Sequence, residues 1–409
     1  MNTLLGFILT AFLLFSTVLA NAQTTVTIRS LAANKPANLN GYIYSPEGTG
    51  PFPAVVLAHG CGGISEREKN WANFLKARGY LALVLDSFTT RSISEVCTAP
   101  PRLTPADRAG DAFGALMFLQ SQTNVIKSRI GMMGFSHGAM TVLAALSETT
   151  PCPLGDAPQF AAATALYPEC LSSEVDVTVP VLIQSAERDD WTAAAPCQMK
   201  AAARKNEGYP VEVEVYPNAL HAFDNPTVQH YYGGSWVNPN KPKFCCGASV
   251  GYSAAATARA EQATDQFFAK HLKSADSKAK PAWAPKPAPA HDEVAGMVKA
   301  AKAFAATSGK SKLIELITSQ DPQFRKRRIF LTVIDKQGIV AAHGKFPVGM
   351  VGIDYSTSKD IDGKPLIASI RSALDQTPPW TSQRTPTTNS DVYVERLEGD
   401  EILVGYLMK

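Results

Sequence analysis

A strong net charge is the first thing this 409-residue sequence lacks. Its formal net charge is only +3, and charged residues make up 18% of the chain. A balance this even creates no field that would attract nucleic acid or an acidic membrane surface. The one dense basic run, residues 325–328, leads directly into the apolar segment 329–334. We therefore interpret this run as the solvated entrance to a strand rather than as a nucleic-acid site.

Long apolar runs are also scarce, because no stretch after residue 22 is long and apolar enough to span a bilayer. The uncharged apolar run Leu4 to Ala20 ends in the small-x-small pattern Ala20-Asn21-Ala22, which is typical of a cleaved secretory signal peptide. No Lys or Arg precedes this run, so an uncleaved anchor is the alternative. We expect cleavage after Ala22 and a periplasmic or secreted mature protein without stable membrane insertion.

Cysteine is limited to seven residues, and the odd number leaves at least one thiol free or paired between chains. Their presence fits an oxidising compartment. We expect Cys61 to stay reduced, as a small buried hydrophobe beside the candidate site described below. The other six could form up to three bridges whose connectivity the sequence does not give: Cys97, Cys152, Cys170, Cys197, Cys245 and Cys246.

One break in composition divides the chain. Residues 274–291 are rich in Pro, Ala and Lys, a mixture that favours an extended spacer and cannot form a packed core. We therefore predict a linker there, between a domain of residues 23–273 and a smaller domain of residues 292–409. Both have ordinary domain sizes.

In the first domain, short apolar runs alternate with helical patterns. This alternation predicts an α/β fold, a doubly wound and mostly parallel sheet with helices on both faces. The runs that we interpret as strands are residues 54–58, 81–85, 130–133, 161–166, 181–183 and 211–215, and the clearest helical patterns are residues 71–78, 106–120 and 254–271.

The candidate nucleophile is Ser136, in the pentapeptide Gly134-Phe135-Ser136-His137-Gly138. The pentapeptide follows an apolar run and precedes a helix-forming segment. A Gly-x-Ser-x-Gly turn in that context lifts a serine hydroxyl above the edge of a sheet, and the glycines permit the tight backbone. The pattern alone also occurs in ordinary turns, so its partners decide the interpretation.

A serine nucleophile needs a base and a carboxylate, which in such sheets follow in the order Ser, Asp, His. His221 follows the sixth predicted strand and is the candidate base; a turn histidine bonded to backbone is the alternative. Three acids follow the fifth predicted strand. We favour Asp189, because it lies nearer the strand end than Asp190, which would be solvated or a helix cap. Glu187 is the third choice.

Two backbone N–H groups are expected to bind the oxyanion of a tetrahedral intermediate. One belongs to His137, which follows the candidate nucleophile. The other is expected in the glycine-rich loop His59-Gly60-Cys61-Gly62-Gly63, and we assign it to Cys61. Arg91 could contact a substrate carboxylate or form a structural salt bridge. We interpret Asp107, Arg108 and Asp111, on a predicted helix, as surface or framework charges.

These segments together resemble the dienelactone hydrolase family of α/β-hydrolases over roughly residues 30–272. The resemblance implies a hydrolase without cofactor or metal, with Ser136, Asp189 and His221 as a triad that forms an acyl-enzyme from an ester or lactone. The family's namesake enzymes carry cysteine where this chain has Ser136, which counts against dienelactone itself as the substrate. The segments that carry the resemblance, in chain order, are His59 to Gly63, Asp86-Ser87-Phe88, Gly134 to Gly138, Asp189-Asp190-Trp191-Thr192 and His221-Ala222-Phe223-Asp224.

In the second domain, a long helical pattern from Asp292 is followed by two hairpin patterns, near residues 328–343 and 391–408. This succession predicts an α+β fold. The domain resembles a single Cache domain, the extracytoplasmic sensor module of bacterial receptors, which implies that it binds a small organic ligand. We identify no candidate catalytic residue in this domain. The matching segments are Val333-Ile334-Asp335-Lys336-Gln337-Gly338, Ala341-Ala342-His343, Gly352-Ile353-Asp354, Asp362-Gly363-Lys364-Pro365 and Val404-Gly405-Tyr406.

Three functions fit these patterns. The first is an exported serine hydrolase of carboxylic esters or lactones with an appended small-molecule-binding domain. The second is a non-catalytic extracytoplasmic binding or sensor protein, and the third is an amidase or exopeptidase with the same triad. The ordered Ser136, Asp189 and His221 favour an enzyme. The sequence does not indicate the natural substrate or the oligomeric state.

Overall fold

The computed structural model describes most of the chain outside its first 22 residues. The expected export segment, residues 1–22, and residues 275–290 of the expected linker lie outside the described part. The described residues are 23–147, 159–171, 173, 175–203, 209–242, 245–274, 291–319, 321–326, 329–345, 350–360, 363–384 and 389–408.

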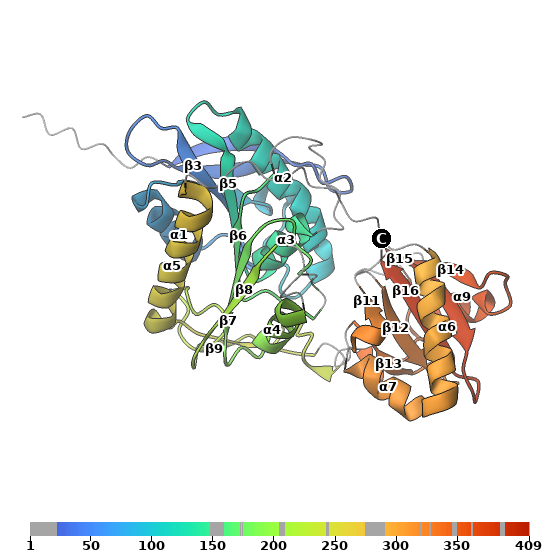
Figure 1. Ribbon diagram of the computed structural model, residues 1–409. Helices are drawn as coiled ribbons and strands as arrows, with labels where there is room; N and C mark the ends of the chain where they lie inside the picture. Colours follow the sequence, from blue (N-terminus) through green and yellow to red (C-terminus); the bar gives the residue numbers. More distant parts are fainter. Residues whose placement is uncertain are drawn as a thin grey trace, which may run out of the picture.

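An eight-stranded sheet forms the centre of the first part, with helices on both of its faces (Figure 1). Its strand order is β1-β2-β4-β3-β5-β6-β7-β8. The pairs β1–β2 and β2–β4 are antiparallel, and all later pairs are parallel. The strands are β1 Thr24–Arg29, β2 Asn38–Tyr44, β3 Phe52–Ala58, β4 Leu81–Asp86, β5 Val125–Phe135, β6 Ala163–Leu166, β7 Val181–Ala186 and β8 Val211–Tyr216.

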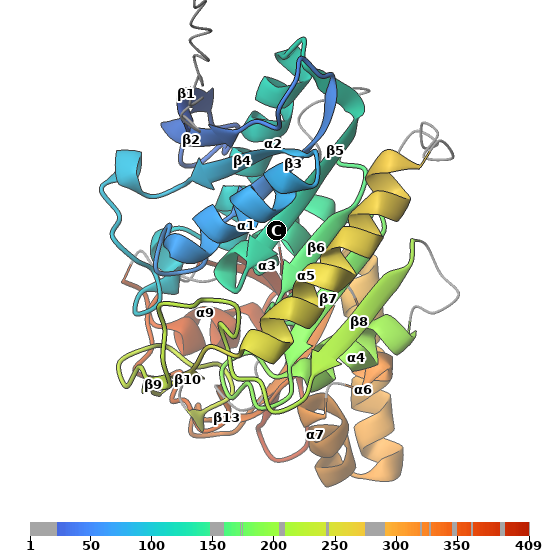
Figure 2. The same cartoon turned by 90° about the vertical axis from the view of Figure 1, so that its left-hand side faces the viewer.

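The helices of this part form two layers. Helices α1 (Glu66–Ala77) and α5 (Ala254–Phe268) cover one face, in front of the sheet in Figure 2. Helices α2 (Pro105–Ser121), α3 (His137–Leu146) and α4 (Ala194–Ala203) cover the other. Side chains of β3 alternate between the layers, because successive strand residues point to opposite faces. Val55 and Leu57 belong to the core under α1 and α5, whereas Ala54 and Val56 belong to the core under α2 and α3.

All six strands expected from the sequence are present, and the mostly parallel α/β sheet is confirmed. The two antiparallel strands β1 and β2, which precede them, were not among the predicted strands. Short elements complete this part: the strand pair β9 (Tyr231–Tyr232) and β10 (Ser249–Val250), 3₁₀ turns at Thr89–Arg91 and Pro100–Arg102, and a π-helical turn at Ala269–Lys273.

The second part contains a six-stranded sheet in which every pair is antiparallel. Helices α6 (His291–Ser308) and α7 (Lys310–Thr318) pack on one face through Val294, Val298 and Leu313, and α9 (Leu366–Ala373) packs on the other. Both predicted hairpins form, as the pairs β12–β13 and β15–β16. The strands are β11 Arg325–Lys326, β12 Ile329–Ile334, β13 Val340–His343, β14 Trp380–Arg384, β15 Asn389–Arg396 and β16 Ile402–Met408, and a 3₁₀ turn spans Pro322–Phe324.

The cysteine pairing corrects one expectation. Cys61 is not reduced, because it forms a disulfide with Cys97 across 36 positions of sequence. The loop of Cys97 returns over the loop that follows β3, so these two thiols lie close together although the sequence separates them. The structure also pairs Cys170 with Cys197 and Cys245 with Cys246, while Cys152 lies outside the described residues.

Within the described ranges, no helix combines the length and the apolar character needed to cross a membrane.

Candidate functional site

Ser136 lies at the sharp turn between β5 and α3, in a strained backbone conformation with a φ of 52°. Residues other than glycine rarely adopt a positive φ, and such strain persists only where the surrounding structure enforces it. The neighbouring glycines show how it is enforced. A Cβ atom on Gly138 would overlap the carbonyl oxygen of Ala58, and one on Gly134 would overlap that of Gly138. Close packing of α3 against β3 therefore requires both glycines and presents Ser136 at the edge of the sheet.

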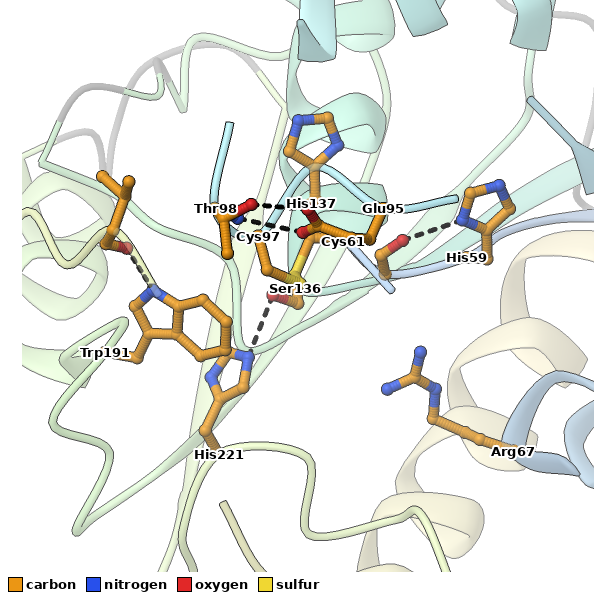
Figure 3. Close-up of a disulfide and its surroundings, with 12 residues drawn as sticks. His59, Cys61, Arg67, Glu95, Cys97, Thr98, Ser136, His137, Trp191 and His221 are labelled. Carbon is orange, nitrogen blue, oxygen red and sulfur yellow. Dashed lines mark hydrogen bonds between the residues drawn. A yellow bond between two sulfur atoms is a disulfide. The ribbon is translucent and has the colours of Figure 1, made fainter. Parts of the chain in front are cut away.

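The structure brings the three candidate residues Ser136, His221 and Asp189 together. His221 Nε2 lies 2.9 Å from Ser136 Oγ (Figure 3), and His221 Nδ1 lies 2.7 Å from Asp189 Oδ2. The three side chains follow β5, β8 and β7, whose carboxyl ends meet at the same edge of the sheet. All three are buried. This is the geometry in which an imidazole can take the serine proton while a carboxylate orients the imidazole.

Local hydrogen bonds fix the carboxylate of Asp189. The backbone N–H groups of Trp191 and Thr192 donate to its Oδ1 at 2.9 and 2.8 Å, and the Thr192 hydroxyl lies 2.9 Å from its Oδ2. Thr192 Oγ1 also lies 3.0 Å from His221 Nδ1. Thr192 thus belongs to the site although no role was predicted for it. The Asp-x-x-Thr spacing, which is typical of a turn closed by an aspartate side chain, was the available signal.

The two competing acids have other partners. The carboxylate of Asp190 accepts a hydrogen bond from the backbone N–H of Ser249 at 2.7 Å, and Glu187 accepts one from the N–H of Asn218 at 2.8 Å. Asp190 therefore anchors β10 beside the site, and Glu187 closes the loop before His221. Of the three acids, Asp189, the one favoured from the sequence, is the acid whose carboxylate lies within hydrogen-bonding distance of the His221 imidazole.

Aromatic rings enclose the imidazole of His221. The ring of Tyr167 contacts it edge-on at 4.6 Å between centroids, and the ring of Trp191 lies at 4.9 Å. Trp191 in turn stacks on Trp236 at 4.6 Å and donates its Nε1–H to the carbonyl oxygen of Val237 at 2.8 Å (Figure 3). These contacts restrict the rotation of the imidazole and keep Nε2 directed at Ser136.

A buried polar network lies behind Tyr167. The Tyr167 hydroxyl donates to the carboxylate of Asp224 at 2.5 Å, and Trp71 Nε1 donates to the same carboxylate at 2.7 Å. Arg67 donates to the Tyr167 hydroxyl at 3.2 Å and forms an ion pair with Glu68. Burial raises the pKa of Asp224 above its ordinary value, although Arg67 and the hydrogen bonds lower it. Burial also raises the pKa of Tyr167, so its hydroxyl stays protonated. The network joins α1 to the loop that carries the base.

Arg91 has a structural role. Its guanidinium makes a bidentate ion pair with Asp111, at 2.9 and 2.8 Å, and donates to the carbonyl oxygens of Ser87 and Lys35. Of the two alternatives from the sequence, the salt bridge is the one that forms. Arg108 and Asp111 are both buried, so they are framework charges rather than surface charges. Asp107 accepts from Thr104 in the capping box of α2.

Two loops carry the N–H groups expected to bind an oxyanion. His137 is the first residue of α3, so its N–H has no carbonyl partner within the helix. Cys61 lies in the turn after β3, where Gly63 N donates to Gly60 O at 3.3 Å. The disulfide to Cys97, beside Ser136 in Figure 3, and a hydrogen bond from Val96 N to Cys61 O at 2.8 Å hold this turn.

Removing the Cys61–Cys97 disulfide is expected to affect both stability and turnover. We predict that Cys61→Ala combined with Cys97→Ala lowers the free energy of unfolding by about 3 to 4 kcal/mol, from the entropy of the opened loop. We also predict a lower kcat, because the turn with the Cys61 N–H loses its cross-link. Urea unfolding and ester hydrolysis would measure the two effects.

The second disulfide provides a matched control for this change. Cys170→Ala with Cys197→Ala opens a loop of comparable length, 27 positions, and should cost similar stability with kcat unchanged. Equal kcat values in the two double variants would contradict the role assigned to the first disulfide.

No cluster of three or more His, Cys, Asp or Glu side chains suited to a metal ion occurs among the described residues.

Comparison with known proteins gives one family match. Residues 39–272 match the profile of the Dienelactone hydrolase family. A protein named probable 2-oxo-3-(5-oxofuran-2-ylidene)propanoate lactonase, from Bradyrhizobium sp, is 24% identical over 192 residues, which are 44% of this chain and 77% of that protein.

Two solved structures illustrate the similarity. A putative dienelactone hydrolase from Klebsiella pneumoniae subsp. pneumoniae MGH 78578 has a TM-score of 0.45 at 17% identity, covering 61% of this chain and all of that one. A thermophilic esterase from the Planctomycetes species Thermogutta terrifontis has a TM-score of 0.45 at 16% identity, covering 61% and 92%.

Proposed function

Because this chain belongs to the dienelactone hydrolase family, which makes it a hydrolase, we propose that it cleaves carboxylic esters or lactones through Ser136, His221 and Asp189. The observation that carries the proposal is the unbroken line of hydrogen bonds from the Ser136 hydroxyl through the His221 imidazole to the Asp189 carboxylate. The name of the Bradyrhizobium relative, a lactonase, agrees with a lactone or ester as substrate.

Acylation begins when His221 Nε2 takes the proton of the Ser136 hydroxyl while Oγ forms a bond to the carbonyl carbon. The carbonyl oxygen becomes an oxyanion, for which the N–H groups of Cys61 and His137 are the proposed donors. The bond from carbon to the leaving oxygen then breaks, and His221 returns its proton to that oxygen. An ester releases an alcohol at this point, whereas a lactone keeps the new hydroxyl on the acyl group.

Deacylation repeats these steps with water. His221 takes one proton from a water molecule as its oxygen bonds to the acyl carbon, and the second oxyanion uses the same donors. The bond to Ser136 Oγ breaks, the serine regains its proton from His221, and a carboxylic acid leaves. The Asp189 carboxylate stabilises the imidazolium that forms twice in each cycle.

Trapping the acyl-enzyme tests this function. With p-nitrophenyl butyrate mixed rapidly with the full chain, we expect a burst of p-nitrophenol equal to the enzyme concentration, because the activated leaving group makes acylation faster than deacylation. Acid quenching and peptide mass spectrometry should place one butyryl group on Ser136. Acylation at another residue, or no acylation, would contradict the proposal and favour the binding-protein alternative. Parallel assays with p-nitroanilide substrates would separate an esterase from an amidase.

We also propose that residues 292–409 bind a small organic anion. A hollow of about 480 Å³ in this part is lined by Lys336, Arg371 and Arg396, together with Asp375 and Asp400, so cationic groups outnumber acidic ones. Thermal unfolding of the full chain should shift upward with a mono- or dicarboxylic acid and not with a neutral analogue. No shift with any acid of the panel would overturn this proposal.

Export of the chain is the last element of the proposed function. The three cysteine pairs support it, since disulfides persist mainly in oxidising compartments. Mass spectrometry of the protein recovered from its native host should find Gln23 as the amino terminus in the periplasmic or culture fraction. An intact Met1 in the cytoplasmic fraction would contradict export.

A further inference from the structure

The two segments expected to bind the oxyanion lie beyond the last paired residues of their strands. Strands β3 and β5 pair in parallel, and the last paired residues are Ala58 and Gly134. Cys61 and His137 each lie three residues beyond this last pair. Beyond the ladder, the close approach of Gly138 to the backbone of Ala58 and His59 holds the start of α3 against this loop, and side-chain contacts add to it.

The guanidinium of Arg108 bridges the two segments. Its Nη1 lies 2.9 Å from Nδ1 of the His137 imidazole, and its Nη2 donates to the carbonyl oxygen of His59 at 2.8 Å. His59 is the first residue after β3 and precedes Cys61 by two positions. A planar guanidinium presents its N–H groups in a fixed fork, so contacts to both acceptors set the separation between the acceptors.

The chemistry of His137 agrees with this contact. Burial, and then the neighbouring Arg108, lower the pKa of the His137 imidazole well below its ordinary value, so the ring is neutral. A neutral imidazole with its proton on Nε2 leaves the Nδ1 lone pair free to accept from the guanidinium. The side chain of the residue after the nucleophile is thereby held in one orientation, which in turn fixes the start of α3.

Arg108 is an unusual framework cation. It is 1% exposed, and among the described residues no carboxylate lies within ion-pair distance of it, whereas the neighbouring Arg91 pairs with Asp111. Burial lowers the pKa of Arg108 to about 10, which still leaves it protonated at neutral pH. A buried cation without a carboxylate partner is costly for stability. The carbonyl of His59 and the imidazole of His137 accept its hydrogen bonds, and the nearby carboxylates of Asp111 and Glu68 also favour its charge.

Helix α2, which contains Arg108, is held in place by its N-terminal cap and by close contacts with the end of β1. Its first turn has a capping box between Thr104 and Asp107. Further along, the backbone of α2 contacts the segment after β1 so closely that a Cβ atom on Gly110 or Gly114 would overlap it, and Leu31 N donates to Gly110 O at 3.0 Å. The guanidinium is therefore projected from an element that is fixed against the edge of the sheet.

We infer that Arg108 is a positioning residue for the oxyanion site, because its guanidinium sets the separation between the loop of Cys61 and the start of α3. It acts through the backbone of these two segments and does not touch substrate. The inference rests on the proposed function, since it concerns the oxyanion of the same acyl transfer. It extends that function by naming the group that preorganises both donors before the reaction.

The test compares Arg108→Met with Arg91→Met in the full chain. Arg91 is a partly buried arginine that pairs with Asp111 and makes no hydrogen bond to either segment, so its replacement should lower the thermal midpoint with little change in kcat. Arg108→Met should lower kcat per titrated active site by about 10- to 100-fold, less than the loss of a donor, with KM within about twofold. The inhibition constant of phenylboronic acid, whose boron bonds to Ser136 Oγ and becomes a tetrahedral anion, should rise by the same factor.

Two further variants keep the test decisive if Arg108→Met does not fold. Arg108→Lys keeps the charge but reaches only one acceptor at a time, so we expect an intermediate loss of kcat. In Arg108→Ala, millimolar methylguanidinium should restore part of the lost kcat with saturation, whereas methylammonium should not.

The outcomes separate the inference from the function. Wild-type kcat and boronic acid affinity in Arg108→Met, or rescue of Arg108→Ala by methylammonium as effective as by methylguanidinium, would overturn the inference and leave the proposed function standing. Absence of Ser136-dependent turnover in the unsubstituted protein would overturn both.

Discussion

Replacing Ser136 by alanine should lower kcat for p-nitrophenyl esters by about 10⁴-fold or more, because the acyl-enzyme can no longer form. A residual rate above that in water should remain, since the oxyanion donors and the binding surface are intact. The fold should be preserved. The substitution removes the hydrogen bond from the Ser136 hydroxyl to His221. The strained turn, with its φ of 52°, does not depend on that bond, because the packing of Gly134 and Gly138 enforces it. Steady-state kinetics and thermal unfolding of the same preparation would measure both effects.

The control for this substitution is Ser185→Ala, the same chemical change at another buried serine of the sheet. The Ser185 hydroxyl has no hydrogen-bond partner among the described residues, and Ser185 lies on β7 away from the turn after β5. Its removal should leave kcat within about twofold and change stability little. If both alanine variants hydrolyse the esters as fast as the unsubstituted protein, the hydrolysis takes place elsewhere and the proposed site is wrong.

The first part of the chain was predictable because buried parallel strands are nearly continuous apolar runs. Residues 54–58 and 81–85 are such runs, and both are central strands with every side chain buried or nearly so. The sharp turn at Ser136 was predictable because the glycine-flanked serine stands between an apolar run and a helical pattern, although the pattern alone also occurs in ordinary turns. The candidate acid and the candidate base could then be sought after later strands of the sheet, in the chain order Ser, Asp, His.

Strands β1 and β2 were not predicted, because only some of their side chains are buried. In β1, Ile28 is the one fully buried residue, Val26 is half-buried, and the three threonines are exposed. Edge strands of this kind carry a weak signal, because their pairing depends on backbone hydrogen bonds to a neighbour rather than on an apolar run. Gly41 on β2, for example, pairs with Val26, and a Cβ atom there would overlap the side chain of Ile28, which no local pattern reveals.

Contacts between distant segments account for the other errors and omissions. Cys61 was expected to be reduced, yet Cys97 reaches it because the loop after β4 folds back over the turn after β3. Tyr167 and Asp224 support His221 from segments 57 positions apart, and Arg108 reaches His59 across 49 positions. A single sequence gives the type of each of these residues but not the tertiary packing that brings them together.

The second large effect is expected from Asp189→Asn, which should lower kcat by about 10⁴-fold while the protein stays folded. The carboxylate accepts a hydrogen bond from the Nδ1–H of His221 at 2.7 Å, and this keeps the Nε2 lone pair directed at Ser136. An asparagine amide can present its NH₂ group to Nδ1 instead. The imidazole then carries its proton on Nε2, and it can no longer accept the serine proton. The loss should appear in kcat with KM nearly unchanged, in steady-state assays with p-nitrophenyl butyrate.

The adjacent Asp190→Asn is the sharpest control, because it makes the same chemical change one residue further along the chain. Asp190 accepts from Ser249 N at 2.7 Å, and an asparagine side-chain oxygen can accept that hydrogen bond equally well. We therefore expect kcat within about threefold of the unsubstituted protein, since a neutral acceptor replaces a charged one outside the proton path. Equal losses in the two variants would mean that the loop as a whole, rather than the Asp189 carboxylate, supports His221. A larger loss in Asp190→Asn would reverse the assignment, because it would show that the acid next to Asp189 orients the base during turnover.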